Sequence, residues 1–261
     1  MSEEIVVRQE GGIVTVTFNR PTVRNAISLA MWREIAQVVE GLGQDESARA
    51  AVFRGAGTEA FASGADISEF KEVRKDKASA QAYNRETEAA YRAVRHCPKA
   101  TVAMIYGFCM GGGMALAMAC DLRFAAEGGK FGIPAARLGI VYSLESTREL
   151  VTLVGPAHAK DILCSARTIE AQEALAIGFL NRLLPAHELE PYTYDYVRKV
   201  AANAPLSVRG AKLAVQAVLE DGAGHLKEEI RRLGLEAFES EDYQEGTRAF
   251  LEKRPPRFQG R

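Results

Sequence analysis

The first half of the chain alternates between short apolar segments and amphipathic ones. Residues 5–8 and 13–18 alternate apolar and polar positions on either side of Gly11-Gly12, which predicts a β-hairpin. Ser28 is the predicted N-cap of a helix that runs to about Leu42 and stops at Gly43. The pattern then predicts a strand at 50–54, a helix at 77–96, a strand at 100–106, a short apolar helix at 114–119 and a strand at 121–126.

After Pro134 the pattern is mostly helical. Helical periodicity is found at 171–177, 192–203, 206–219, 226–238 and 243–251, and residues 180–184 form the one further strand expected in this half. Strand–helix alternation followed by helices predicts an α/β core over residues 1–200 and a helical C-terminal extension over 201–261. With 261 residues, 47% of them hydrophobic, the chain is expected to be globular.

Composition excludes several partners. A net charge of −1 provides no electrostatic basis for binding nucleic acid or an anionic membrane. The longest apolar runs fall short of the ~20 residues that a membrane span needs, and the acidic start Met-Ser-Glu-Glu is unlike a signal peptide. The four cysteines lack metal or disulfide spacing and lie in apolar surroundings. We therefore expect a cytoplasmic protein with free, buried thiols.

Two glycine turns are the strongest chemical signal. Gly111-Gly112-Gly113 follows one predicted buried strand and begins a helix, while Ser63-Gly64-Ala65-Asp66 forms a tight turn after another. Two such turns can direct two backbone N–H groups at one carbonyl oxygen, which is how an oxyanion hole is built. The glycines match neither the P-loop nor the dinucleotide fingerprint, so ATP and NAD are not expected.

Six segments occur in a recognisable order and spacing: residues 19–21 (Asn-Arg-Pro), 24–26 (Arg-Asn-Ala), 61–67, 110–121, 131–134 (Phe-Gly-Ile-Pro) and 241–261. With these segments the chain resembles the enoyl-CoA hydratase/isomerase family, or crotonase superfamily, from about residue 4 to its end. The resemblance implies a spiral of ββα turns whose C-terminal helices build homotrimers, often paired into hexamers. It also implies an acyl-CoA substrate, with coenzyme A as part of that substrate and no permanently bound cofactor.

The resemblance also assigns candidate residues. The backbone N–H groups of Ala65 and Gly112 match the oxyanion hole of the family. The positions that match its coenzyme A contacts are Arg24, Ala26, Ala62, Asp66, Ile67 and, in the tail and often from a neighbouring subunit, Lys253 and Phe258. A solvated lysine and a packed phenylalanine would explain the last two positions equally well.

The chain departs from the family pattern at the catalytic carboxylates. Hydratases of this family have two glutamates at positions that are Ala115 and Ala135 here. A methyl group accepts no proton, and general acid–base catalysis contributes roughly 10²–10⁴ in rate. An oxyanion hole alone still stabilises an enolate, so we expect decarboxylation of a malonyl-type CoA ester rather than ordinary hydration.

Two side chains are candidates for further contacts with the acyl group. Tyr142 lies in a segment that resembles the methylmalonyl-CoA decarboxylases of the superfamily, where a tyrosine holds the substrate carboxylate, although those enzymes have histidine at the position of Ala65. Glu145 is an alternative base for hydration or isomerisation, or else an exposed acid in the first turn of a helix. A non-catalytic oligomer that binds acyl-CoA is the remaining alternative.

Overall fold

A six-stranded sheet forms the centre of the computed structural model, which describes residues 3–219 and 224–261. The hairpin of β1 and β2 is antiparallel, and the remaining neighbours in the sheet are parallel. In spatial order the strands are β1 (Ile5–Glu10), β2 (Ile13–Phe18), β3 (Ala50–Gly55), β5 (Ala100–Ile105), β7 (Leu122–Ala126) and β10 (Arg182–Leu184). The predicted hairpin and the strands predicted near 50–54, 100–106, 121–126 and 180–184 are confirmed.

A second, smaller sheet was not predicted. Its strands are β4 (Ala60–Ala62), β6 (Phe108–Met110), β8 (Lys130–Gly132) and β9 (Ile169–Glu170). Strands of two or three residues are too short to show a period of two in the sequence. Each of β3, β5 and β7 is followed directly by a strand of the small sheet, and β4 and β6 then lead into helices. The ββα spiral that the resemblance implies is therefore present.

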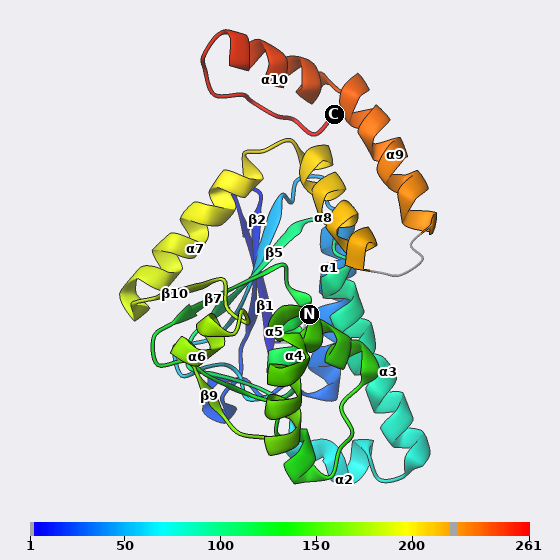
Figure 1. The fold of residues 1–261 in the computed structure, drawn as a ribbon, viewed down its shortest axis with the longest axis vertical. Coiled ribbons are helices and arrows are strands. Elements are labelled where there is room, and N and C mark those ends of the chain that lie inside the picture. Colours follow the sequence, from blue (N-terminus) through cyan, green and yellow to red (C-terminus); the bar gives the residue numbers. More distant parts are fainter. Residues whose placement is uncertain (1–2, 220–223) are drawn as a thin grey trace.

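Helices cover both faces of the large sheet. On one face lie α1 (Leu29–Gln44), α3 (Lys77–Arg95) and α4 (Gly112–Ala119), and on the other lies α7 (Ala186–Ala201) (Figure 1). Successive residues of a strand point to opposite faces, so Phe53 joins the core under α1 and α3 while Val52 joins the core under α7. The sheet thus separates two hydrophobic cores.

Two predictions about local structure were wrong, and one helix had been left without bounds. Helix α1 continues past Gly43, because the amide of Asp45 still donates to the Gly41 carbonyl 3.1 Å away. Helix α5 (Leu144–Ser165) lies in a region expected to be helical but was given no bounds, because Gly155, at φ 74°, and Pro156 interrupt its pattern; in the structure they produce only a kink. Cys164 is exposed, whereas Cys97, Cys109 and Cys120 are buried as expected.

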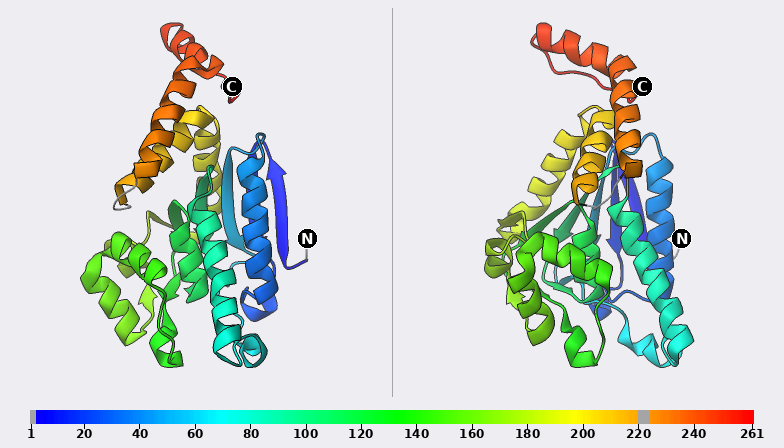
Figure 2. Two further views of the ribbon diagram at one scale, coloured as in Figure 1. Left: turned by 90° about the vertical axis from the view of Figure 1, so that its right-hand side faces the viewer. Right: turned by 45° about the vertical axis from the view of Figure 1, so that its right-hand side comes forward.

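Of the last three helices, α8 (Pro205–Leu219) contacts β5, while α9 (Gly224–Glu239) and α10 (Glu241–Leu251) extend beyond the sheet (Figures 1 and 2). They expose the large apolar side chains Val215, Val218, Leu219, Leu235, Phe238, Tyr243, Phe250 and Leu251. After α10 the chain folds back along this helix, where Arg254 pairs with Glu245 at 2.6 Å. No helix of the described residues is long and apolar enough to cross a bilayer.

Candidate active site

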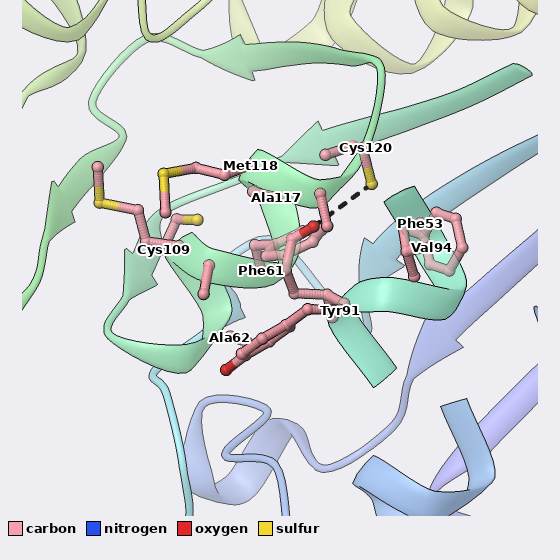
Figure 3. Close-up of a cluster of buried hydrophobic side chains, with 14 of the residues drawn as sticks. Phe53, Phe61, Ala62, Tyr91, Val94, Cys109, Ala117, Met118 and Cys120 are labelled. Atoms are coloured by element: carbon pink, nitrogen blue, oxygen red, sulfur yellow. Dashed lines mark hydrogen bonds between the residues drawn. The ribbon is translucent and has the colours of Figure 1, made fainter. Parts of the chain in front are cut away.

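Helix α4 is buried on every side, as expected for a helix that is apolar all round. Arg123, only 2% exposed, donates to the carbonyl of Cys120 at 2.8 Å and to that of Ala117 at 3.4 Å. A cation is favourable at the C-terminus of a helix. Figure 3 shows Ala117, Met118 and Cys120 within the buried side-chain cluster. The C-terminal end of α4 is thus fixed in the core, while its N-terminal end faces a cavity.

The N-terminus of α4 presents the first donor of the predicted oxyanion hole. Gly111 is the N-cap, with φ 49°, and donates to the Gly132 carbonyl at 2.8 Å. Gly112 opens the helix, where N–H groups lack partners within the helix. Among the described residues, the Gly112 N–H has no backbone acceptor. This N–H is therefore available to a ligand.

The second donor lies in the turn before η2 (Ile67–Glu69). Ile27 donates to the Gly64 carbonyl at 2.8 Å and accepts from Asp66 at 2.9 Å, which leaves the intervening Ala65 N–H without an acceptor among the described residues. Gly64 has φ 110°, and a Cβ on it would lie 3.1 Å from the Met110 carbonyl oxygen and 3.5 Å from the Gly112 nitrogen. The two turns are thus in close contact, and both line one cavity. This arrangement fits an oxyanion hole.

The cavity has a volume of about 230 Å³. It lies beside α3 and the segment that joins η3 (Pro134–Leu138) to α5. Ala135 and Tyr142 both line it, whereas Ala115 is buried in the adjacent core. The wall at Ala135 is therefore apolar where a hydratase of the family has a carboxylate.

Glu88 of α3 is the carboxylate that lines the cavity among the described residues, and the sequence analysis missed it. Its Oε1 accepts a hydrogen bond of 2.6 Å from the Ser143 hydroxyl. The same Ser143 oxygen accepts from the Ser146 amide at 3.2 Å and thereby caps α5. Ser143 therefore links the start of α5 to the one acid in the cavity wall.

Two phenols lie beside this acid. A Cβ on Gly112 would be 3.2 Å from the Tyr91 hydroxyl, so this hydroxyl adjoins the oxyanion hole. Figure 3 shows it at the edge of the buried cluster, directed away from Phe53 and Val94. The Tyr142 hydroxyl is buried and, among the described residues, has no hydrogen bond of good geometry. Burial raises the pKa of both phenols, and for Tyr142 the Ser146 hydroxyl offsets part of the rise.

The two phenols are consequently neutral at physiological pH. A neutral phenol can donate a hydrogen bond to a ligand but does not act as a base. Tyr83, behind the oxyanion hole, is similar, because burial raises its pKa to about 12. The cavity thus combines one carboxylate with neutral hydroxyl donors.

Glu145 lies elsewhere. It is exposed and lines a different cavity, together with Arg148 and Lys212. Adjacent residues of a helix point about 100° apart, and in α5 it is Ser146, 3% exposed, that faces the site. The structure therefore does not bring Glu145 to the predicted oxyanion hole. Of the two interpretations of this residue, a base in the site or an exposed acid in the first turn of a helix, its position agrees with the second.

Of the predicted coenzyme A contacts between residues 24 and 67, only Ile67 lines the cavity. Ile67 lines the cavity and is 55% exposed, and the buried Ala62 packs against Gly113. The Ala26 carbonyl and the Asp66 carboxylate accept from one nitrogen of the Arg20 side chain, at 2.9 and 2.8 Å. Burial raises the pKa of Asp66, but the hydrogen bonds from Ser68 and Arg20 outweigh it, and the net shift is downward.

The charged and tail candidates are engaged with other groups. Arg24 pairs with Glu59 at 2.7 Å and stacks over the Phe108 ring at 4.8 Å. Phe258 packs against Gly246, and Lys253 is exposed. The segment after α10 lies at the opposite end of the molecule from α2 (Phe70–Val73) (Figure 1). Within one chain, Lys253 and Phe258 do not reach the cavity.

Comparison with known proteins identifies the family. The family model described as enoyl-CoA hydratase/isomerase matches residues 8–261. The chain belongs to this family. The short-chain-enoyl-CoA hydratase of Clostridium acetobutylicum is 33% identical to this family member over 96% of the chain and 95% of its own length. The 2,3-dehydroadipyl-CoA hydratase of Escherichia coli is 32% identical over the full length of both chains.

Solved structures agree. An enoyl-CoA hydratase/carnithine racemase from Magnetospirillum magneticum superposes with a TM-score of 0.94 at 36% identity, covering 100% of this chain and 97% of that one. This member of the enoyl-CoA hydratase/isomerase family is therefore an enzyme of the crotonase superfamily that acts on CoA thioesters.

Proposed function

We propose that the protein hydrates an enoyl-CoA, with Glu88 as its general base and the N–H groups of Ala65 and Gly112 as its oxyanion hole. The observation that carries the proposal is the position of Glu88 in the wall of the cavity that these two residues line. The similar proteins named above as hydratases support the reaction class. In this proposal the acid comes from α3 rather than from the positions of Ala115 and Ala135.

One carboxylate suffices for both proton transfers. The oxygen of a water molecule attacks the β-carbon of the enoyl thioester while Glu88 takes a proton from that water. The electrons of the double bond move to the thioester oxygen, where the two N–H groups stabilise the enolate. The protonated Glu88 then returns its proton to the α-carbon, so that water is added in full and the carboxylate is regenerated. Tyr91 donates a hydrogen bond beside the enolate.

Decarboxylation of a malonyl-type ester, our expectation from the sequence, fits this cavity less well. The carboxylate of such a substrate would share a small cavity with Glu88, and like charges at close range in a poorly solvated site repel strongly. The buried Tyr142 hydroxyl remains a candidate donor to that carboxylate. Release of CO₂ from malonyl-CoA homologues, measured alongside hydration, distinguishes the two reactions.

The test compares two substitutions on the same helix. Glu88→Gln keeps the shape of the side chain and an acceptor for Ser143 but removes the base, so kcat for hydration of crotonyl-CoA should fall about 10²–10⁴-fold. Glu86→Gln is the matched control, because Glu86 pairs with Arg33 at 3.2 Å and does not line the cavity. Its kinetics should remain those of the wild type.

Three results would contradict the proposal. Full activity of Glu88→Gln would exclude Glu88 as the base. CO₂ release or a double-bond shift without hydration would assign the oxyanion hole to another reaction. Tight acyl-CoA binding without any turnover would indicate the non-catalytic oligomer.

The proposal extends to assembly. The exposed apolar side chains of α8–α10 form a surface that a second copy of the chain would cover, and we propose a homotrimer or hexamer built through it. In such an assembly, the tail with Lys253 and Phe258 would contact coenzyme A held by a neighbouring subunit. Light scattering on the purified protein measures the mass, and a monomer at micromolar concentration would exclude this arrangement.

A further inference from the structure

Within the part of the chain that the structure describes, Arg74 is a cation in the wall of the cavity without an anionic partner. It follows α2, and its guanidinium stacks over the rings of Phe70 at 5.0 Å and Tyr83 at 5.3 Å. All three residues line the cavity. Among the described residues, Arg74 forms no ion pair, and its N–H groups donate no hydrogen bond. By contrast, Arg20 pairs with Asp66 and Arg95 pairs with Glu149.

The stacking fixes the position of this cation relative to the oxyanion hole. A Cβ on Gly112 would lie 3.0 Å from the Trp32 ring, whose Nε1 donates to the Tyr83 hydroxyl at 3.0 Å. The guanidinium of Arg74 lies over the same tyrosine ring. A continuous wall of Trp32, Tyr83 and Arg74 therefore leads from the hole to an unpaired positive charge.

The charges along this wall differ in sign. Glu88 and Tyr83 both belong to α3 and line the cavity, between one and two helical turns apart. The carboxylate is at Glu88, whereas the guanidinium of Arg74 lies over the ring of Tyr83. A substrate carboxylate close to the thioester would face Glu88 and be repelled. A carboxylate at the far end of an acyl chain would instead meet a guanidinium, whose planar fork of donors matches it.

We infer that Arg74 recognises a carboxylate at the distal end of the acyl chain, so that the preferred substrates are CoA thioesters of dicarboxylic acids. The inference rests on the proposed function only in placing the acyl chain along α3. A phosphate of coenzyme A is the other source of an anion for Arg74. The acyl carboxylate is favoured because Arg74 stacks on the side of the cavity formed by Tyr83 and α3, whereas the predicted coenzyme A contacts are at residues 24–26 and 62–67.

Binding of unreactive thioesters tests the inference without any turnover. Calorimetry measures the dissociation constants of suberoyl-CoA and octanoyl-CoA, which have the same chain length and differ in the terminal carboxylate. The wild type should bind suberoyl-CoA more tightly. Arg74→Gln should weaken suberoyl-CoA binding roughly 10- to 100-fold and leave octanoyl-CoA binding unchanged, while Arg74→Lys should restore part of the preference.

Matched variants separate this inference from the proposed function. Arg85→Gln removes an exposed arginine of α3 that does not line the cavity and should change neither constant. Glu88→Gln should lower kcat for hydration about 10²–10⁴-fold yet keep the preference for suberoyl-CoA. Equal weakening of both ligands by Arg74→Gln would assign Arg74 to a coenzyme A phosphate and overturn the inference. Equal binding of both ligands by the wild type would overturn it as well.

Discussion

Gly113→Ala tests whether the spacing of the oxyanion hole depends on one missing methyl group. Gly113 is the residue of α4 that faces β4, and a Cβ on it would lie 2.6 Å from the carbonyl oxygen of Ala62 and 2.8 Å from the Cβ of Ala62. Both of these atoms belong to or adjoin the backbone, so neither can rotate away. The alanine fits only if α4 moves away from β4.

The size of that movement follows from ordinary contact distances. A carbon–oxygen contact normally measures about 3.3–3.6 Å, so the helix and the strand must separate by roughly 0.7 Å. The Gly112 N–H moves with α4, whereas the Ala65 N–H is held by the bridge to Ile27. A misplacement of this order, or the loss of one oxyanion donor, costs about 10²-fold in rate.

Stability should fall as well. Overpacking a close contact costs roughly 1–3 kcal/mol, and each kcal/mol lowers Tm by about 2–4 °C in a domain of this size. The matched control is Gly41→Ala in α1, where nothing lies within 4 Å of the added Cβ. Since alanine favours the helix by up to about 1 kcal/mol, this control should keep or raise Tm.

The assay is steady-state turnover of the thioester that the wild type accepts, combined with thermal melting followed by circular dichroism. We expect Gly113→Ala to lose kcat and Tm together, with a smaller change in KM. Wild-type kcat and Tm in Gly113→Ala would show that α4 can shift without disturbing the hole. The reasoning from the Ala62 contact would then be wrong.

Two further predictions concern other parts of the chain. Tyr142→Phe removes a buried hydroxyl that has no hydrogen bond of good geometry among the described residues. The free energy of unfolding should therefore stay constant or rise by about 1 kcal/mol, while kcat/KM falls. A lower Tm with unchanged kinetics would contradict a role of Tyr142 in the site. Hydrogen bonds from Arg254 and then from the Arg257 amide lower the pKa of Glu245 from 4.5 to about 2. Their stabilisation is therefore complete above pH 4.5 and is lost as the pH falls toward 2. Arg254→Ala should flatten this acid dependence in amide exchange of α10, and an unchanged pH profile would refute it.

Much of the architecture could be predicted because it depends on local patterns. Residues 13–18 have the apolar period of a strand, and Ser28 is the N-cap that the structure confirms, with its side chain accepting from Met31. The strands of the small sheet could not be predicted, because two or three residues do not establish a period. The bounds of helix α5 could not be predicted, because a glycine and a proline interrupt the pattern of a helix that only kinks at them.

The features of the candidate site also fall into those that local sequence patterns predict and those that they do not. The two glycine turns that meet at the cavity could be predicted, because Gly64 and Gly111–Gly113 follow apolar strands and such turns expose backbone donors whatever the side chains are. The absence of glutamates at Ala115 and Ala135 is equally a property of the sequence. The role of α3 could not be predicted, because helical periodicity identifies an apolar face but not what lies opposite the polar one.

The sequence by itself determined the family, the order along the chain of the strands in the large sheet and the two glycine turns with their backbone donors, since these depend on residues close together in the chain. Only the tertiary structure decided which side chains face those turns. It brought Glu88 and Tyr91 beside Gly112, left Arg74 as an unpaired cation in the same wall and kept Glu145 out. The physical reason is that contacts between residues distant in the chain depend on how α3 and α5 pack, and this packing is a property of the whole core.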